Sequence, residues 1–214
     1  MLTLYFSPGA CSMAAHTLLE EIGKPYEAKP VALRKGQQRT PDYLKINPVG
    51  KVPVLAIDGK YLTENVAILS YLGRKFPEAK LWPAGGVETE AEVFSLLAWL
   101  ATSVHPCFGR MFGPQRTCDM PGAEESVVRI ARGETERNFA LIDAKLAGKD
   151  WAFGTYSVAD PYLFVFHHWA ATRFNLDVSP YPNYRAHYQR VLARPAVKRM
   201  LEKEQIVQKQ LEAA

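Results

Sequence analysis

The sequence predicts an α/β sandwich at the N-terminus followed by an all-α domain. Over the first third of the chain, short apolar runs alternate with segments of helical periodicity about every ten to fifteen residues. A proline- and glycine-rich segment without periodicity follows at 77–86, and beyond it the pattern is helical almost throughout. We therefore predict domains at 1–78 and 87–214, joined by a linker at 79–86.

The N-terminal domain is expected to follow the order strand, helix, strand, short helix, strand, strand, helix. Its first strand is predicted at 2–6, an apolar and aromatic run that ends in a Ser-Pro-Gly turn. The first helix is predicted at 12–22, and Gly23 is expected to end it because glycine suits a helix C-terminus. The remaining elements are predicted at 26–33 (strand), 42–46 (short helix), 52–57 and 60–62 (a hairpin turning at Asp58-Gly59) and 64–76 (helix).

The C-terminal domain is expected to be an all-α bundle, because its strand signals are weak and its apolar residues recur at helical spacing. Helices are predicted at about 88–104, 124–146, 158–174, 183–192 and 196–210. We find no internal repeat and no low-complexity segment.

Composition and charge exclude several classes of protein. With 48% hydrophobic and 22% charged residues, the chain is expected to fold rather than to be disordered. The formal net charge is +4 without a long block of one sign, and the concentrated basic stripe typical of nucleic-acid binding is absent. We therefore expect no nucleic-acid partner. A basic rim around a site for an anionic small molecule fits the same charge equally well.

The cysteines and the first residues indicate a soluble protein of a reducing compartment. Cys11, Cys107 and Cys118 are odd in number and irregularly spaced, unlike a disulfide framework. The sequence MLTLYFSPGACS lacks the regions of a signal peptide, and no apolar run approaches the length needed to cross a bilayer. We expect a cytoplasmic protein without a membrane partner and without a metal ion.

Cys11 is the residue best placed for chemistry. A turn delivers it to the first turn of a predicted helix, where unpaired backbone N–H groups and the helix dipole favour an anion. A thiolate is such an anion, so we expect the pKa of Cys11 to be lowered and its reactivity to be raised. The alternative is a buried structural cysteine, which is common. The position three residues on is Ala14, so a two-cysteine redox motif is absent.

Two further junctions have features of a ligand site. Pro53 enters a predicted strand after a Gly-Lys turn, and a cis Val52–Pro53 bond would leave the Val52 backbone free to pair with an extended peptide ligand. An ordinary trans proline at a strand start is the alternative. Thr63 or Glu64 is expected to cap the next helix, whose exposed N–H groups suit a carboxylate. Capping without a ligand is the alternative there.

Taken together, these segments resemble the glutathione S-transferases, and the bacterial beta class most closely. The matching pieces are YFSPGACS at 5–12, NPVGKVPVL at 47–55, LTENVAI at 62–68 and YL at 71–72. In the second domain, Ser157 and Asp160 match the family's capping box, and Ala193-Arg194-Pro195 with Val197 match the start of its last helix. The resemblance runs the whole length of the chain, and the order and spacing of the pieces make it specific.

The resemblance implies a thioredoxin-like domain that binds glutathione and an all-α domain that supplies most of a second-substrate pocket, usually in a homodimer. Glutathione is the implied cosubstrate, and a small hydrophobic electrophile is the implied partner in a detoxification reaction. The implied catalytic residues are Cys11, which faces the glutathione sulfur, and His105 near the sulfur. Ser12 is the third, since either its hydroxyl or the Cys11 backbone N–H is expected to donate a hydrogen bond to the sulfur.

The resemblance also implies which residues bind the two substrates. The Val52 backbone is expected to hold the cysteinyl part of glutathione, Glu64 and Asn65 its γ-glutamyl end, and Lys35 its glycyl carboxylate. The full set expected at glutathione is Tyr5, Cys11, Lys35, Lys51, Val52, Pro53, Glu64, Asn65 and His105. The second-substrate pocket is expected to be lined by Phe108, Met111, Phe112, His167 and Trp169, each of which has a place in the core as its alternative.

The sequence departs from the family pattern at four positions. Asn65 stands where a small residue is usual, and Ala98 stands where close relatives carry an asparagine. Pro106 is expected to kink or end the helix that carries His105. Cys107 replaces a common glycine and either approaches Cys11 or packs by itself.

Three functions remain open at this point. The first is glutathione transfer to a small hydrophobic electrophile. The second is a glutathione-dependent disulfide or peroxide reductase in which Cys11 is the nucleophile. The third is a noncatalytic ligand-binding protein on the same fold, because a fold does not fix a function.

Overall fold

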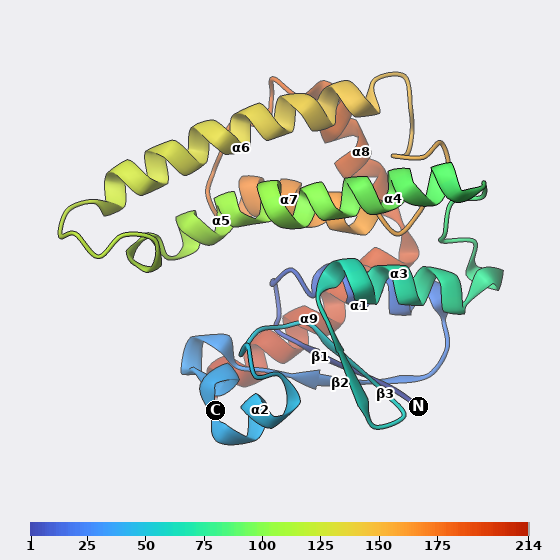
Figure 1. Cartoon of the computed structure of the whole chain (residues 1–214), viewed down its shortest axis with the longest axis horizontal. Coiled ribbons are helices and arrows are strands. Elements are labelled where there is room, and N and C mark those ends of the chain that lie inside the picture. The colour runs from blue at the N-terminus through green and yellow to red at the C-terminus, as the bar shows by residue number, and fades with distance from the viewer. Residues whose placement is uncertain (214) are drawn as a thin grey trace. The chain divides into compact units, whose positions relative to one another are not determined.

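The protein is described by a computed structural model covering residues 1–213, and it folds into two compact units (Figure 1). The first unit consists of Met1–Pro83 and the segment that begins at Val191, and the second unit is Ala84–Arg190. This division differs from the predicted domains in one respect. Residues from 191 onward group with the N-terminal unit rather than with the helical one.

A four-stranded sheet in the order β2-β1-β3-β4 is the framework of the first unit. Strand β1 (Leu2–Phe6) pairs in parallel with β2 (Tyr26–Pro30) and antiparallel with β3 (Val54–Ile57), which pairs with β4 (Lys60–Thr63). The predicted hairpin is present, with positive φ angles of 47° at Asp58 and 85° at Gly59.

The second and third strands are shorter than predicted. Strand β2 ends at Pro30, and two short 3₁₀ turns, Leu33–Lys35 and Gln37–Arg39, follow where the strand was expected to continue. Strand β3 begins after Pro53, because proline has no N–H to donate to a strand ladder.

Three helices and a 3₁₀ turn complete Met1–Pro83. They are α1 (Met13–Ile22), α2 (Pro41–Ile46), α3 (Asn65–Lys75) and the turn Pro77–Ala79. Gly23 ends α1 in the left-handed conformation, as predicted. Helices α1 and α3 contact each other and the strands, and the core of this unit includes the fully buried Leu4, Leu18, Val54, Leu55, Ile68, Leu69 and Leu72. Burial of this apolar surface fixes the start of α1 beside the end of β1.

Helix α9 (Pro195–Ala213) packs on α1 through charged side chains as well as apolar ones. Glu20 pairs with Arg199 at 3.0 Å and with Lys203 at 2.5 Å. Glu21 accepts two hydrogen bonds from the Arg194 guanidinium, at 2.5 and 3.0 Å. These contacts explain why the last helix belongs to the first unit.

The second unit is helical, as predicted. Helices α6 (Glu124–Leu146) and α7 (Asp160–Thr172) of this unit, and α8 (Pro182–Ala193), which crosses its boundary at Arg190, lie within two residues of their predicted bounds. Helix α4 is Val87–Trp99, helix α5 is His105–Phe112, and a 3₁₀ turn follows at Pro114–Arg116. The sequence did not predict α5, because Pro106 was expected to interrupt the helix there.

A π-helical turn explains how the helix passes Pro106. The turn is Leu100–Val104, and His105 after it keeps helical angles, with φ −59° and ψ −42°. Inside an α-helix, proline lacks the N–H for the usual bond, and its ring crowds the carbonyl four residues earlier. The longer i→i+5 spacing of a π turn relieves both problems. The helix therefore does not end at Pro106, which was one of the two predicted outcomes, and continues to Phe112.

The same helical stretch, Val87–Phe112, corrects another expectation. It has 26 residues and contains an 18-residue window with a mean hydropathy of 1.2, enough to cross a membrane by length and composition alone. Five of its apolar side chains are fully buried, namely Val93, Leu97, Leu100, Val104 and Phe108. Such burial is typical of a core helix in a folded helical unit, so the stretch is weak evidence for a membrane span.

The predicted capping box is present before α7. The Asp160 carboxylate accepts from the Ser157 backbone N–H at 2.7 Å and from the Ser157 hydroxyl at 2.9 Å. Its other oxygen accepts from the Ala152 N–H at 3.0 Å and lies 2.8 Å from His187 Nε2. All of these groups are buried in the helical unit, which agrees with a folding role.

Candidate functional site

The loop between β1 and α1 holds Cys11 by internal hydrogen bonds. The Ser12 hydroxyl donates to the Ser7 carbonyl at 3.1 Å and accepts from the Ser7 N–H at 3.2 Å. The Ala10 N–H donates to the same Ser7 carbonyl at 3.0 Å. Because the Ser12 side chain is fully buried and its proton is used inside the loop, Ser12 shapes the turn. The sequence-based catalytic role of Ser12 stays a prediction, and in this arrangement its hydroxyl is engaged with Ser7.

Cys11 lies at the meeting point of three segments. Its sulfur is 3.5 Å from the Val52 carbonyl, to which the thiol donates. Its own carbonyl accepts from the Asn65 side-chain amide at 3.1 Å. Lys51 and Glu64 are close enough to act on its charge. The three segments that the sequence analysis combined are thus brought together around one side chain.

The protonation of Cys11 is opposite to the sequence-based expectation. Burial raises the pKa of the thiol to about 12, from an ordinary value of 9.0. The backbone N–H at Cys11, the Lys51 charge and the Asn65 amide act to lower the pKa, whereas Glu64 raises it further. With only 8% of the residue exposed, desolvation of the thiolate outweighs the helix N-terminus. Cys11 is therefore a neutral thiol at physiological pH.

The segment before β3 is fixed by polar contacts with α2. The Lys51 carbonyl accepts from the Tyr43 hydroxyl and from the Asn47 amide, both at 2.8 Å. At Gly50, with φ 64°, a Cβ would come within 2.7 Å of the Gln38 carbonyl, so only glycine fits. The Val52–Pro53 bond that follows is cis, the first of the two alternatives that the sequence left open. Val52 and Val54 are buried in a small apolar cluster with Tyr43 and Val31.

Glu64 and Asn65 form the junction between β4 and α3, and they differ in exposure. Glu64 is exposed and has φ 68°, a positive angle that costs energy for a residue with a side chain. Asn65 is 6% exposed, and while its amide nitrogen contacts Cys11, its Oδ1 has no hydrogen-bond partner among the described residues. The amide nitrogen of Asn65 is therefore engaged with the Cys11 backbone, whereas its oxygen is not.

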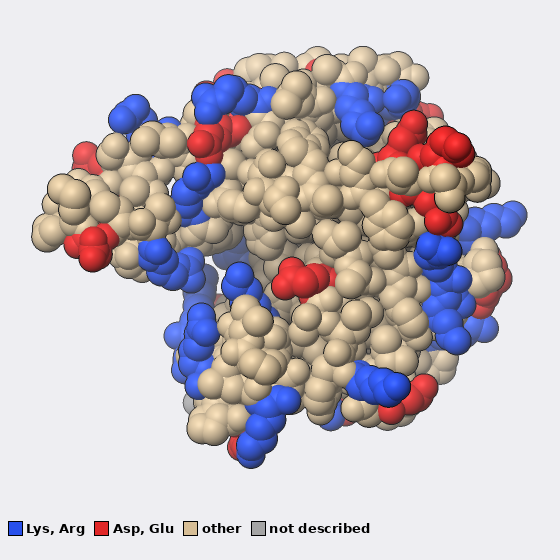
Figure 2. Space-filling view, viewed as in Figure 1, with Lys and Arg blue, Asp and Glu red and all other residues tan. Residues whose placement is uncertain are grey.

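Tyr5 and Lys35 are placed less directly at Cys11. The Tyr5 ring packs edge-on against Tyr43 and Tyr61, each at 6.3 Å, and beside the cluster that contains Val52. Burial raises the pKa of its phenol. Lys35 is exposed at the end of a 3₁₀ turn. Lys and Arg side chains lie in several separate places on the face seen in Figure 2, in agreement with the dispersed charge of the sequence.

His105 lies in an aromatic environment of the helical unit. Its Nδ1 is 3.2 Å from the Tyr162 hydroxyl, and its ring contacts Phe166 at 5.7 Å and Trp169 at 5.4 Å. Sequence reasoning did not find Tyr162 as a partner of His105. Cys107, two residues on, is buried and donates to the Ser103 carbonyl at 3.1 Å, so it is packed within its own unit.

The predicted second-substrate residues divide into core and surface. Phe108 is fully buried at the centre of what we call the aromatic cluster, which consists of Phe108, Phe112, Phe166, Trp169 and Phe174. Met111 is 7% exposed and Trp169 is 3% exposed, whereas Phe112 is 48% exposed. Phe112 is therefore the member of the predicted set that offers an apolar surface.

His167 is a core residue, contrary to the prediction. Its ring stacks on Tyr188 at 4.2 Å and meets the Tyr184 ring edge at 5.0 Å. It is 2% exposed, and neither ring nitrogen has a partner among the described residues. Burial, with a smaller contribution from the neighbouring His187, lowers the pKa of His167 to about 4. A neutral, enclosed imidazole of this kind is packing rather than pocket lining.

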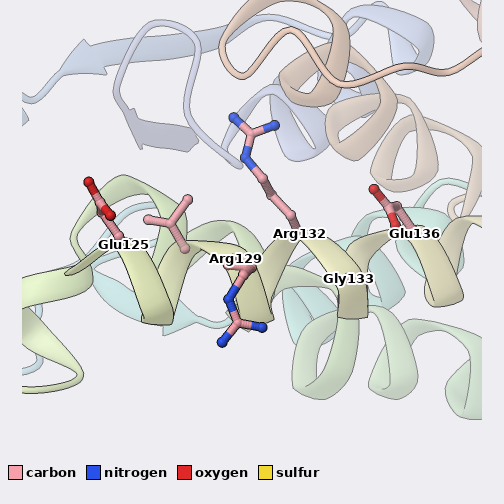
Figure 3. Close-up of a pocket in the computed structure, with 6 residues that line it drawn as sticks. Glu125, Arg129, Arg132, Gly133 and Glu136 are labelled. Atoms are coloured by element: carbon pink, nitrogen blue, oxygen red, sulfur yellow. The ribbon is translucent and has the colours of Figure 1, made fainter. Parts of the chain in front are cut away.

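A shallow hollow of about 630 Å³ lies elsewhere in the helical unit, along α6 (Figure 3). It is lined by Glu125, Val128, Arg129, Arg132, Gly133 and Glu136. Arg132 is tied down, since it donates to the Phe174 carbonyl at 3.2 Å. None of the residues predicted for the second substrate lines this hollow.

Comparison with known proteins identifies the family. Models of the glutathione S-transferase N-terminal and C-terminal domains match residues 1–74 and 97–195. Glutathione S-transferase GST-4.5 of Xanthomonas campestris is 34% identical over 202 residues, which cover 94% of this chain and 98% of the relative.

Two solved structures extend the likeness to the fold. One is a sphingomonad glutathione S-transferase complexed with glutathione, and the other is the bacterial beta class enzyme of Sphingomonas chungbukensis. Each has a TM-score of 0.83 and 36% identity, over 94% of this chain and 98% of the other. With the sheet, the helical unit and the segments meeting at Cys11, these findings show that the chain belongs to the glutathione S-transferase family, with a thioredoxin-like and a helical domain, and is a glutathione transferase.

Proposed function

We propose that the protein conjugates glutathione to small hydrophobic electrophiles, and that glutathione binds in the first unit beside Cys11. The observation that carries this proposal is the convergence at Cys11 of the Val52 carbonyl, the Asn65 amide and the charges of Lys51 and Glu64. An extended tripeptide with a charge at each end fits such a surface, because the surface presents a backbone group between a positive and a negative side chain.

The parts of glutathione are assigned by chemistry. The Val52 backbone pairs with the cysteinyl residue, and the exposed Glu64 carboxylate receives the γ-glutamyl ammonium group. The backbone N–H groups at the start of α3 receive the γ-glutamyl carboxylate. The exposed Lys35 and Lys51 are the candidates for the glycyl carboxylate. The strained φ of 68° at Glu64 supports a functional use of this junction.

The reacting thiolate belongs to glutathione rather than to Cys11. The start of α1 and the Lys51 charge stabilise an anion at this place, and the Cys11 thiol is a neutral donor beside it. Glutathione sulfur then attacks the electrophile, forming a carbon–sulfur bond as the leaving group departs with its electron pair. His105 keeps a proposed role as a proton acceptor or donor, which rests on the family resemblance alone.

The electrophile is proposed to bind against the apolar surface that includes Phe112. This ring is 48% exposed and lies edge-on to Trp169, with 5.2 Å between the ring centroids, so it presents an aromatic surface that packs against Trp169. Met111 and Trp169 back this surface with little exposed area of their own. We also propose a cytoplasmic homodimer that acts in detoxification, as the family resemblance implies.

The reductase alternative has less support. Thiol exchange needs a thiolate, and a thiol that is 8% exposed with a pKa of about 12 supplies almost none near neutral pH. All three cysteines are free, and the two others lie in the helical unit.

Calorimetric titration of glutathione into the purified protein tests the proposal. We expect saturable binding that Glu64→Gln weakens at least about tenfold, a loss typical for one charge-assisted contact. Glu78→Gln is the matched control, because Glu78 is an exposed carboxylate of the same unit that pairs only weakly with Lys24 at 3.7 Å. Absence of binding to the wild-type protein, or equal weakening by both substitutions, would contradict the proposed site.

The conjugation step is tested with 1-chloro-2,4-dinitrobenzene as the electrophile. Formation of the dinitrophenyl conjugate should saturate in both substrates, and Phe112→Ala should raise KM for the electrophile without changing KM for glutathione. A change confined to KM for glutathione would remove Phe112 from the electrophile site.

A further inference from the structure

A buried carboxylate on the C-terminal helix contacts the loop that carries Cys11. Glu204 of α9 is 3% exposed, and it divides its two oxygens between different elements. Oε2 accepts from the backbone N–H of Gly9 at 2.7 Å, and Oε1 lies 2.8 Å from Nδ1 of His16. The pair with Gly9 joins residues 195 positions apart, so no local sequence pattern announces it.

The backbone N–H of Gly9, in the Ser7–Ser12 loop that carries Cys11, needs a hydrogen-bond acceptor. Inside the loop, the Ser12 hydroxyl and the Ala10 N–H both donate hydrogen bonds to the Ser7 carbonyl. Gly9 has φ 70°, a left-handed conformation in the middle of the loop, and its N–H donates to Glu204 on α9 instead. Burial raises the pKa of Glu204, whereas its hydrogen bonds with His16 and with the Gly9 N–H favour the carboxylate and lower the pKa. A carboxylate oxygen is a stronger acceptor than a neutral oxygen, so it is well suited to hold this N–H.

The second contact anchors the carboxylate to the helix that follows Cys11. His16 lies five residues after Cys11, in α1, and its side chain is fully buried. Its ring packs on Phe6 at 4.9 Å and on Tyr26 at 5.9 Å, which fixes the direction of Nδ1. Glu204 therefore links a backbone group before Cys11 to a side chain after it.

Burial of a carboxylate is costly unless strong hydrogen bonds compensate, and an apolar side chain would fill the same space without that cost. The ion pairs of Glu20 with the half-exposed Arg199 and Lys203 already attach α9 to α1. Attachment of the helix alone therefore does not require Glu204, whereas a fixed Gly9 N–H does.

We propose that Glu204 is a positioning residue for the glutathione site, because it fixes the Ser7–Ser12 loop and thereby the orientation of Cys11 and of the N-terminus of α1. Glu204 itself touches no substrate. This inference rests on the proposed function in one respect only, that the reaction uses the site at Cys11. The position of the Cys11 thiol can be measured without glutathione.

A graded series of variants tests the inference. Glu204→Leu removes the acceptor, Glu204→Gln keeps an acceptor but removes the charge, and Lys203→Ala is the control that weakens α9 attachment at the neighbouring residue. Two readouts are compared: the rate of Cys11 alkylation by iodoacetamide, followed by mass spectrometry, and the separate values of KM for glutathione and kcat.

We expect alkylation of Cys11 and KM for glutathione to increase about tenfold in Glu204→Leu and about threefold in Glu204→Gln, with kcat less affected. Lys203→Ala should match the wild type in both. Should Glu204→Leu fail to fold, Glu204→Gln decides, together with deuterium exchange of the peptide that contains Gly9. Wild-type alkylation and exchange in folded Glu204→Gln, or an equal effect of Lys203→Ala, would overturn the inference.

The two proposals fail in different ways. If the wild-type protein binds no glutathione, the proposed function fails, but the alkylation series still reports whether Glu204 holds the loop. If glutathione binds and Cys11 of the Glu204 variants is alkylated at the wild-type rate, Glu204 does not position the loop and the proposed function stands.

Discussion

The Cys11 site and the aromatic cluster of the helical unit are built in different ways. At Cys11, short segments meet through backbone groups, as in the contact of the thiol with the Val52 carbonyl at 3.5 Å. In the aromatic cluster, side chains from two helices and the residues after them meet ring to ring, as Phe108 does with Trp169 at 5.5 Å. A substitution in the first region should therefore change ligand geometry, and one in the second should change stability.

The largest effect is expected from Phe108→Ala. The ring is fully buried and contacts Phe139, Phe166, Trp169 and Phe174 at 5.5–6.2 Å. Its removal leaves a cavity and should lower the free energy of unfolding by about 3–5 kcal/mol. Denaturant unfolding measures this change. Phe112→Ala is the matched control, because its half-exposed ring should cost less than about 1 kcal/mol. Equal losses would mean that Phe108 is no more a core residue than Phe112.

A smaller effect, on pH dependence, is expected from His167. Its folded pKa of about 4 lies below the ordinary 6.5, so the unfolded chain binds the proton more readily. The free energy of unfolding is therefore unaffected by His167 above pH 6.5. It decreases as the pH falls toward 4, because in this range the unfolded chain takes up the proton and the folded protein does not. The shift of 2.5 pH units corresponds to a loss on the order of 3 kcal/mol.

His167→Phe isolates this contribution, since a phenyl ring suits the stack on Tyr188. The variant should lose less stability than the wild type between pH 6.5 and pH 4. Above pH 7 the two proteins should show the same pH dependence. Parallel curves over the acid range would show that His167 is not the titrating group. Because burial also lowers the pKa of His168, some acid sensitivity should remain in the variant.

The sequence predicted the first region better than the second. Cys11, Val52 and Glu64 each follow or precede a strand at a turn with a recognisable pattern, and strand order then brings the turns together. Phe108 and Phe112 lie one turn apart on the same face of α5, yet Phe108 is fully buried and Phe112, the last residue of the helix, is 48% exposed. Spacing alone does not distinguish them.

Three expectations of the sequence analysis did not take account of interactions that the structure shows. The lowered pKa expected for Cys11 considered the helix N-terminus but not the desolvation that dominates. The donor role of Ser12 overlooked the Ser7 carbonyl, which takes its proton. The break expected at Pro106 did not allow for a π turn before it. Glu204 was missed entirely, because only the tertiary fold brings α9 to the loop.

The smallest expected effect tests the central claim most directly, namely that the protein transfers glutathione without using Cys11 as a nucleophile. We would measure conjugation of 1-chloro-2,4-dinitrobenzene and reduction of a glutathione mixed disulfide in the wild type and in Cys11→Ala. Because a buried neutral thiol contributes at most one hydrogen bond, kcat/KM for conjugation should fall no more than about tenfold. A loss of conjugation beyond about a hundredfold, or wild-type disulfide reduction that disappears in Cys11→Ala, would contradict the account.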